Sequence, residues 1–229
     1  MSLLFPVRCA VCGEPIEKGE DLCEDCGSVL IRMSDKTCKR CGREIPYCFC
    51  EGNKKDFDRL AAPFYYEGVA REAVLRLKHR KGFSTADFFA REMKRVFERE
   101  YLEEDFDLMC SVPVTSGQIK SRGFNQSGVI AGRLSELLDI DYRPEALRKL
   151  FDNSTQHFLS SFERTGNIFG VYEADHSVVW GKNILLVDDI VTTGATSGEC
   201  ATMLKLRGAN RVCVICAAVS RPYSYCLPK

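Results

Sequence analysis

The sequence predicts an α/β fold, a mainly parallel sheet flanked by helices, with a small cysteine-rich module ahead of it. Short apolar runs typical of buried strands alternate with helical patterns through the second part of the chain. Two of these runs open into loops of small polar residues followed by a helix, as parallel strands do at anion sites. Eight of the thirteen cysteines lie before residue 51. We therefore expect a module over residues 1–56 and a larger domain over residues 57–229.

The early cysteines form three Cys-x-x-Cys pairs and one shorter Cys-x-Cys pair: Cys9 and Cys12, Cys23 and Cys26, Cys38 and Cys41, and Cys48 and Cys50. Glycine directly follows each of the first three pairs, where a positive φ lets backbone amides face the thiolates. Four thiolates per tetrahedral zinc ion give two structural sites. Sequential pairing puts the first four cysteines around one ion and the last four around the other, and a crossed pairing stays open. With few large apolar residues, this segment needs the metal to fold.

Charge and hydropathy exclude several classes of protein. The formal net charge is zero, so nothing in the composition demands a polyanionic partner, and any contact with nucleic acid must be local. Residues 1–7 are too short and too proline-interrupted for a signal sequence, and no apolar run approaches the roughly 20 residues of a membrane span. We expect a cytoplasmic protein, in which paired cysteines bind metal more often than they form disulfides.

The larger domain opens, after a charged linker over residues 51–58, with a strand and two helices. Residues 60–66 alternate weakly and are rich in aromatics, which indicates a strand. Residues 69–78 have apolar positions at helical spacing. This helix runs into the basic residues 76–81, which form either a solvated helix end or a set of phosphate contacts. Ser84 caps the next helix, and the inner face of that helix carries Phe88, Phe89, Met93, Val96 and Phe97.

Two further strands and a helix occupy the middle of the domain. Residues 107–112 form a strand that ends at Pro113, because proline cannot donate to a sheet. Residues 114–120 are expected to be a small polar loop, and apolar spacing predicts a helix over residues 130–138. Residues 146–150 are typical of a short strand.

The most informative stretch is residues 183–196. Its apolar run over residues 184–187, with β-branched residues at both ends, indicates a strand buried on both faces. We expect the strand to end at Asp188 and Asp189. A loop of small residues then precedes a helix, and its hydroxyl and N–H groups can surround a phosphate: Thr192, Thr193, Gly194, Ala195 and Thr196.

The last helix and strand close the domain. The helix ends near Gly208, which suits a left-handed cap, and residues 211–219 form the last buried strand. Cys213 and Cys216 have the spacing of a metal pair, but residues three apart in a strand face opposite sides of the sheet. We interpret these two, with Cys110 and Cys200, as small buried apolar residues.

Paired carboxylates beside a hydroxyl-rich loop suit a ligand that carries vicinal hydroxyls and a phosphate. Residues 187–196 resemble the phosphoribosyl pyrophosphate (PRPP) motif of type I phosphoribosyltransferases. The resemblance implies that Asp188 and Asp189 hold the ribose 2- and 3-hydroxyls, and that residues 192–196 bind the 5-phosphate. The alternative is purely structural, since a buried strand can end in two acids and a helix can start with threonine and glycine.

Two other segments take their roles from the same resemblance. The first loop, with Val114, Thr115, Ser116 and Gly117 followed by Arg122, stands where these transferases bind pyrophosphate. Residues 151–170 form a long polar segment, as functional loops often do. In type I phosphoribosyltransferases a mobile hood that closes over PRPP occupies this position. The resemblance therefore makes Gln156, Arg164 and Asn167 candidate ligand contacts. Arg164 has an alternative role in pairing with Glu163 or another surface acid.

The segments 122–126, 156–160 and 163–167, taken with the cysteine pairs, look like those of the ComF family. Its members join a double zinc ribbon to a phosphoribosyltransferase-like domain, and the resemblance covers nearly the whole chain. The shortened pair Cys48 and Cys50 is the clearest departure, and it weakens only the second metal site.

The family resemblance leaves two functions open. One is a transferase of nucleotide metabolism that uses PRPP and Mg²⁺, releases pyrophosphate, and passes ribose phosphate to an unknown acceptor. The other is a non-catalytic PRPP-sensing module that binds single-stranded DNA. The family name comes from natural competence, so both readings imply a role with DNA-uptake proteins. Candidate contacts to DNA phosphates are Arg8, Arg40, Arg43 and the basic residues 76–81.

Overall fold

The computed structural model describes residues 6–48, 50, 55–77, 83–150 and 171–221. At the centre lies a parallel sheet in the order β1-β7-β6-β3, with the short β2 also paired to β7. Its strands are β1 (Arg59–Ala61), β2 (Phe64–Tyr65), β3 (Leu108–Ser111), β6 (Asn183–Val191) and β7 (Arg211–Val219). The expected parallel sheet flanked by helices is therefore confirmed.

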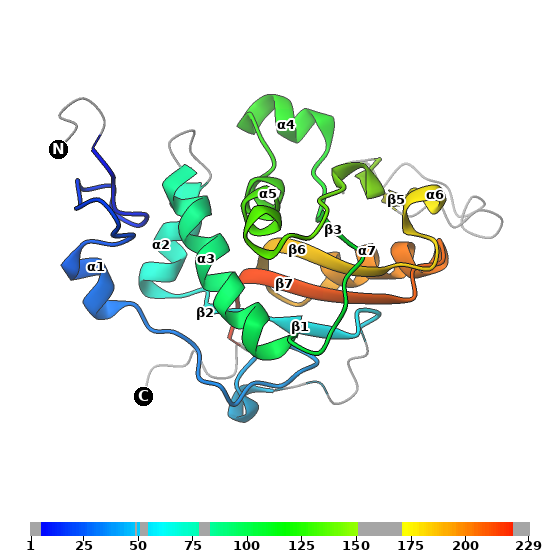
Figure 1. The fold of residues 1–229 in the computed structure, drawn as a ribbon, viewed down its shortest axis with the longest axis horizontal. Helices are drawn as coiled ribbons and strands as arrows, with labels where there is room; N and C mark the ends of the chain where they lie inside the picture. Colours follow the sequence, from blue (N-terminus) through cyan, green and yellow to red (C-terminus); the bar gives the residue numbers. More distant parts are fainter. Residues whose placement is uncertain (1–5, 49, 51–54, 78–82, 151–170, 222–229) are drawn as a thin grey trace.

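Helices cover both faces of this sheet (Figure 1). One layer is formed by α2 (Gly68–Leu77), α3 (Phe83–Glu100) and α5 (Gln126–Leu138). Its core takes in the side chains of Leu185 and Val187 from β6, whereas Ile184 and Leu186 face the opposite core under α7 (Ala195–Leu206). This alternation makes β6 apolar on both sides, as a buried parallel strand must be.

The remaining elements are short. The N-terminal module holds α1 (Glu24–Val29) and the 3₁₀ turn η1 (Ile45–Tyr47). Next to the large sheet, β4 (Leu147–Lys149) and β5 (Tyr172–Ala174) form an antiparallel pair. The helix α4 (Ser116–Arg122), the 3₁₀ turn η2 (Pro144–Ala146) and α6 (His176–Val179) complete the described chain. None of its helices is both long enough and apolar enough to cross a membrane.

Several element boundaries differ from those expected. β6 does not stop at the two acids but continues to Val191, because its pairing with β7 runs on from Asp188 opposite Cys216 to Val191 opposite Val219. The loop expected over residues 114–120 becomes α4 from Ser116 onward, because Thr115 caps it. Ala62 and Pro63 divide the strand expected over residues 60–66, and α3 begins before Ser84.

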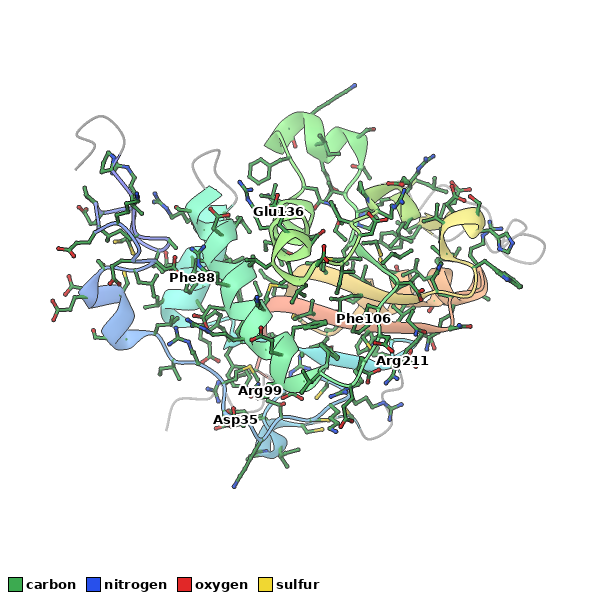
Figure 2. All side chains as sticks on the ribbon, viewed as in Figure 1. Asp35, Phe88, Arg99, Phe106, Glu136 and Arg211 are labelled. Atoms are coloured by element: carbon green, nitrogen blue, oxygen red, sulfur yellow. The ribbon has the colours of Figure 1, made fainter. Side chains whose placement is uncertain are left out.

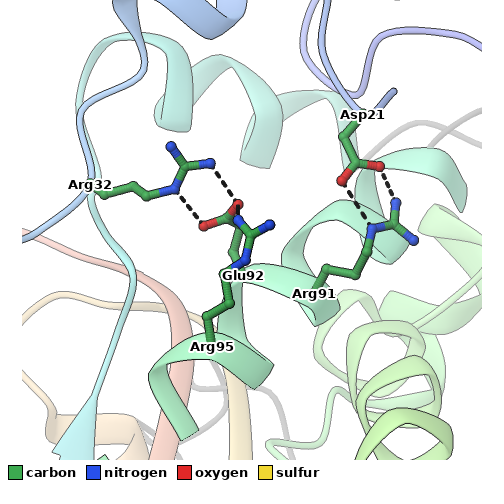
Figure 3. A network of polar contacts seen from close by, with 5 residues as sticks. All are labelled: Asp21, Arg32, Arg91, Glu92 and Arg95. Carbon is green, nitrogen blue, oxygen red and sulfur yellow. Dashed lines mark hydrogen bonds and ion pairs between the residues drawn. The ribbon is translucent and has the colours of Figure 1, made fainter. Parts of the chain in front are cut away.

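The first half of the module, residues 6–32, packs on the helical layer through its backbone and through two arginine contacts (Figure 3). Thr85 of α3 donates its hydroxyl to the carbonyl of Ala10 at 2.7 Å. The guanidinium of Arg32 makes a two-bond contact with the buried carboxylate of Glu92, with N···O distances of 2.8 and 2.7 Å. Arg91 forms the corresponding pair with Asp21. Such bidentate contacts fix orientation as well as distance.

The second half of the module, residues 33–50, contacts the end of α3, where Asp35 pairs with Arg99 at 2.7 Å, and also reaches the sheet. The backbone N–H of Leu60 in β1 donates to the carbonyl of Lys39 at 3.1 Å. Gly42 has a φ of +69°, and a Cβ atom at this position would lie 2.3 Å from the side chain of Leu60. Only glycine allows so close an approach. The module therefore contacts two different parts of the domain. Figure 2 labels Asp35 of the module and Arg99 of α3 among the described side chains.

Candidate functional site

The eight module cysteines form two clusters in sequential order. Within each cluster all four sulfur atoms lie within 4.8 Å of one another: Cys9, Cys12, Cys23 and Cys26 in the first, and Cys38, Cys41, Cys48 and Cys50 in the second. The separations of 3.6 Å between Cys12 and Cys23 and 3.8 Å between Cys41 and Cys48 approach the ~3.8 Å expected around tetrahedral zinc. The crossed pairing does not occur, and the shorter Cys-x-Cys pair fits its cluster as well as the others do.

The chemistry of the donor set also fits zinc, which binds thiolates. Burial raises the pKa of Cys9, but backbone N–H groups that face its sulfur outweigh burial and lower the pKa to about 6. At Cys38 the same balance of burial against backbone N–H groups lowers the pKa to about 7. Burial is the main cause that raises the pKa of the other shifted thiols, those of Cys12, Cys26, Cys48 and Cys50. Without a metal ion, each cluster therefore holds one thiol that ionises readily beside thiols that do not. Both sites would be structural, because four cysteines complete the coordination of the metal.

The second candidate site lies at the carboxyl ends of the parallel strands β3 and β6, of which β6 continues beyond the end of β3. Ser111 of β3 pairs with Val187 of β6, so the loops after both strands leave the sheet at one edge. We call this the carboxyl edge. It brings together the two loops that the sequence singled out, residues 114–117 and residues 192–196. Ligands of open parallel sheets bind at such an edge.

Asp188 is buried at this edge, with 5% of its surface exposed. One carboxylate oxygen accepts the hydroxyl of Ser127 and the other accepts the hydroxyl of Ser197, both at 3.1 Å. Ser127 stands in the first turn of α5 and Ser197 in the first turn of α7. Burial, followed by the negative charge of Asp189, raises the pKa of Asp188 well above its ordinary value. The carboxylate therefore joins strand β6 to the beginnings of two helices.

Asp189 has a different environment. It is half-buried, and one of its carboxylate oxygens accepts the backbone N–H of Ile190 at 2.8 Å. Its own N–H donates to the hydroxyl oxygen of Ser127 at 3.1 Å, so the serine that holds Asp188 also orients Asp189. The two adjacent acids thus differ in accessibility, and Asp189 is the one that is open to a ligand.

The loop after β6, residues 192–196, is exposed except at Gly194. Gly194 has a φ of +77° and stands directly before α7, and a Cβ atom there would meet the ring of Phe57 at 3.6 Å. The side chains of Thr192, Thr193 and Thr196 reach solvent beside the N-terminus of α7. The first N–H of this helix, that of Ala195, donates to the hydroxyl of Thr193 at 3.3 Å. The N-terminus also directs the positive end of the helix dipole toward solvent, where it favours an anion.

The loop after β3 is shorter than expected. The hydroxyl oxygen of Thr115 accepts the backbone N–H of Gln118 at 3.2 Å, and the side-chain oxygen of Gln118 accepts the backbone N–H of Thr115 at 3.0 Å. This capping box starts α4, with Ser116 and Gly117 exposed in its first turn and Val114 half-buried before it.

The segment after α4 returns the chain to the same edge. Arg122 ends α4, and Gly123 follows with a φ of +90°. The side-chain amide of Asn125 then donates to the carbonyl of Val112 at 3.0 Å, which ties the start of α5 to the end of β3. The segment 122–126 is thus a connection that brings α5, and with it Ser127, back to the edge.

Other expected contacts fall outside the site or outside the described residues. Gln156, Arg164 and Asn167 lie outside the described residues, as do residues 78–81 of the basic run. Arg8 donates to the carbonyl of Gly13 at 3.0 Å. Arg43, named above as a candidate DNA contact, is 3% exposed and bonded to main-chain carbonyls.

The sequence did not predict the structural roles of Arg43, Ser127 and Ser197, whose side chains form hydrogen bonds at the end of β6. A hydroxyl residue directly after the motif was the available signal for Ser197. No local pattern pointed to Ser127.

The double zinc ribbon family matches residues 1–56. The DNA utilization protein YhgH of Escherichia coli (strain K12) is 30% identical over 228 residues, which cover 93% of this chain and 97% of that protein. The competence protein ComFC of Bacillus subtilis (strain 168) is 25% identical over 205 residues, covering 84% and 81%. Among solved structures, the allosteric regulatory enzyme of purine biosynthesis aligns with a TM-score of 0.47 at 22% identity, over 62% of this chain and 30% of that chain.

We expect protein purified without chelator to contain about two equivalents of zinc, because two clusters of four thiols are assembled. Replacing Cys9 and Cys12 together by serine should remove about one equivalent. The control Cys110→Ala, at a buried cysteine outside the clusters, should leave both. Elemental analysis gives the content, and less than about half an equivalent in wild-type protein with oxidised thiols would contradict the assignment.

The raised pKa of Asp188 gives a pH-dependent prediction. A carboxyl group whose pKa is higher in the folded than in the unfolded state destabilises the fold above its raised pKa, and this penalty vanishes as the pH falls below its ordinary value. Asp188→Asn should therefore melt at a higher temperature than wild type at pH 7 to 8. The increase should be about 2–4 °C for each kcal/mol of destabilisation that the substitution removes. The difference should shrink on acidification. Asp105→Asn, at an exposed acid, is the control. A wild type that melts higher at neutral pH would show that the serine hydroxyls stabilise the ionised form.

Proposed function

The chain belongs to the ComF family, in which a double zinc ribbon precedes a phosphoribosyltransferase-like domain, and from that membership we propose that its carboxyl edge binds PRPP with Mg²⁺. The observation that carries the proposal is the loop 192–196, which is exposed at the N-terminus of α7 beside the half-buried Asp189. A phosphate and a ribose diol lie on neighbouring positions of one ligand, as these two features lie on neighbouring positions of this edge.

Each part of the edge has its own role in the proposal. The N–H and hydroxyl groups of residues 192–196 bind the 5-phosphate, and the loop at residues 114–117 receives the pyrophosphate with its Mg²⁺. Asp189 accepts the ribose hydroxyls. Asp188, whose oxygens accept two serine hydroxyls, holds Asp189 and both helix starts in place. By the family resemblance, Gln156, Arg164 and Asn167 complete the ligand contacts.

The same arrangement supports transfer of the ribose phosphate. As the bond from the anomeric carbon to pyrophosphate breaks, its electron pair leaves with pyrophosphate and positive charge develops on the ribose ring. The carboxylate of Asp189, held against the ring hydroxyls, stabilises that charge. Mg²⁺ supplies positive charge to the departing pyrophosphate. An acceptor with a free lone pair then forms the new bond to the anomeric carbon.

The biological setting that we propose is DNA uptake, because the relatives are a DNA utilization protein and a competence protein. A second candidate, a PRPP sensor that binds single-stranded DNA without turnover, is favoured by one observation. Arg40 and Lys55 line the same cavity as Thr193 and Gly194, which places two cations beside the phosphate loop. Cations in this position can contact the phosphates of a strand that passes over the edge.

We expect Asp189→Asn to weaken PRPP binding in the presence of Mg²⁺ at least tenfold, about 1.4 kcal/mol, because an amide accepts hydroxyl bonds less strongly than a carboxylate does. Isothermal titration calorimetry measures the affinity. Asp105→Asn, which removes the same charge from an exposed position, should bind as wild type does. Unchanged affinity in Asp189→Asn would show that this carboxylate does not bind the ribose diol.

Turnover distinguishes the two candidate functions. We expect pyrophosphate release from PRPP and Mg²⁺ to depend on one member of a panel of nucleobases and amines. Binding of single-stranded oligonucleotides, measured across salt concentrations, is the parallel assay, because contacts to phosphates weaken steeply as salt rises. Salt-sensitive DNA binding with no release against any acceptor would favour the sensor.

A further inference from the structure

Arg43 links the second cysteine cluster to the phosphate loop. It lies two residues after Cys41 and is almost fully buried. Its Nη2 donates to the carbonyl oxygen of Thr192 at 2.5 Å, and its Nε donates to the carbonyl oxygen of Ser220 at 2.8 Å. Thr192 follows β6 and Ser220 follows β7. A single guanidinium thus joins the ends of the two central strands at the point where the phosphate loop begins.

The carbonyl of Thr192 is held by more than this one bond. The hydroxyl of Ser220 donates to the same oxygen at 3.1 Å, and the N–H of Ser220 donates to the carbonyl of Val191 at 3.0 Å. Charged donors such as the guanidinium make the stronger contacts in such a set. The first peptide of the loop is therefore fixed in orientation.

Fixing that carbonyl also fixes a phosphate donor. The carbonyl of Thr192 and the N–H of Thr193 belong to one planar trans peptide, so they point in opposite directions. When Arg43 draws the oxygen toward the module, the N–H of Thr193 must face away from the module. Rotation of this peptide by even a few tens of degrees would misdirect the first donor of the loop.

The module in turn holds Arg43. The backbone carbonyl of Arg43 accepts the N–H of Cys38 at 2.7 Å, which closes the turn around the second cluster. The preceding Gly42 packs against Leu60 of β1 with no space for a side chain. The guanidinium can therefore keep its position only while the second cluster keeps its fold, and a structural metal stabilises such a fold.

We propose that Arg43 is a positioning residue for the phosphate loop, so that the second half of the zinc module is a working part of the ligand site. This inference rests on the proposed function, since it takes residues 192–196 as the site of a ribose 5-phosphate group. The first half of the module, which packs on α3 through Arg32, has no such role. The two halves of the ribbon therefore differ in what they do.

Arg43→Ala and Arg32→Ala form a matched pair of variants, because each removes an arginine that joins the module to the larger domain. Two ligands are titrated calorimetrically into each variant: ribose 5-phosphate, which needs the loop at residues 192–196, and magnesium pyrophosphate, which needs the loop at residues 114–117. We expect Arg43→Ala to lose at least tenfold in affinity for ribose 5-phosphate and less than twofold for pyrophosphate. Arg32→Ala should retain both affinities.

Amide hydrogen exchange without ligand provides a readout that does not depend on binding. We expect faster exchange at residues 193–196 in Arg43→Ala and wild-type rates there in Arg32→Ala. If the alanine variant does not fold, Arg43→Lys replaces it, because lysine keeps the charge but cannot donate to both carbonyls as a fork. We then expect a several-fold loss of affinity for ribose 5-phosphate and unchanged affinity for pyrophosphate.

The outcomes separate the inference from the proposed function. Equal affinity of wild type and Arg43→Ala for ribose 5-phosphate, with unchanged exchange, overturns the inference and leaves the proposed function standing. Equal losses for both ligands, or an equal loss in Arg32→Ala, also overturn it, because they indicate a general loss of stability. A wild type that binds neither ligand overturns the proposed function, and the exchange rates alone then decide whether Arg43 orders the loop.

Discussion

The buried carboxylate of Asp188 is the constraint on which the rest of the carboxyl edge depends. An ionisable group inside a parallel sheet is unfavourable unless hydrogen bonds compensate for its loss of water. Here the compensation comes from Ser127 and Ser197, which stand in the first turns of α5 and α7. Satisfying one carboxylate therefore fixes the beginnings of two helices relative to β6. Phosphates often bind at helix N-termini, and these two N-termini lie at the edge where we propose that PRPP binds.

The zinc module has two attachments of different character. Its first half packs on the helical layer through arginine–carboxylate pairs that orient it without approaching the carboxyl edge. Its second half reaches the sheet itself, where Arg43 bonds to the main chain after β6 and β7. We propose that the module supports the phosphate loop through this second attachment, so that its metal sites act through structure and not through coordination of the ligand.

Apolar periodicity was sufficient to predict β7 over residues 211–219 and the opposite orientations of Cys213 and Cys216. It failed at the end of β6, because the strand continues through Asp188 and Asp189 by backbone pairing that side-chain hydropathy does not register. It also failed at α4, whose small polar residues are typical of a loop until the capping box is recognised.

The candidate site, like the fold, was predicted only in part. Residue types were enough to single out both acids and the threonine-rich loop, but not to show that only Asp189 is open to a ligand. Ser127, which contacts both acids, is sixty-one positions from Asp188 in the sequence. Arg43 was expected to face DNA and is instead buried, because the contacts that cover it come from residues far along the chain.

An amide ¹H–¹⁵N titration of the protein with PRPP and Mg²⁺ is the most direct test of ligand binding at the carboxyl edge. We expect the largest changes in chemical shift at residues 189–197 and at residues 114–117, with smaller changes at residues 41–43 and none around the first cysteine cluster. Changes confined to the first cluster, or a spectrum unaffected by saturating ligand, would contradict binding at this edge.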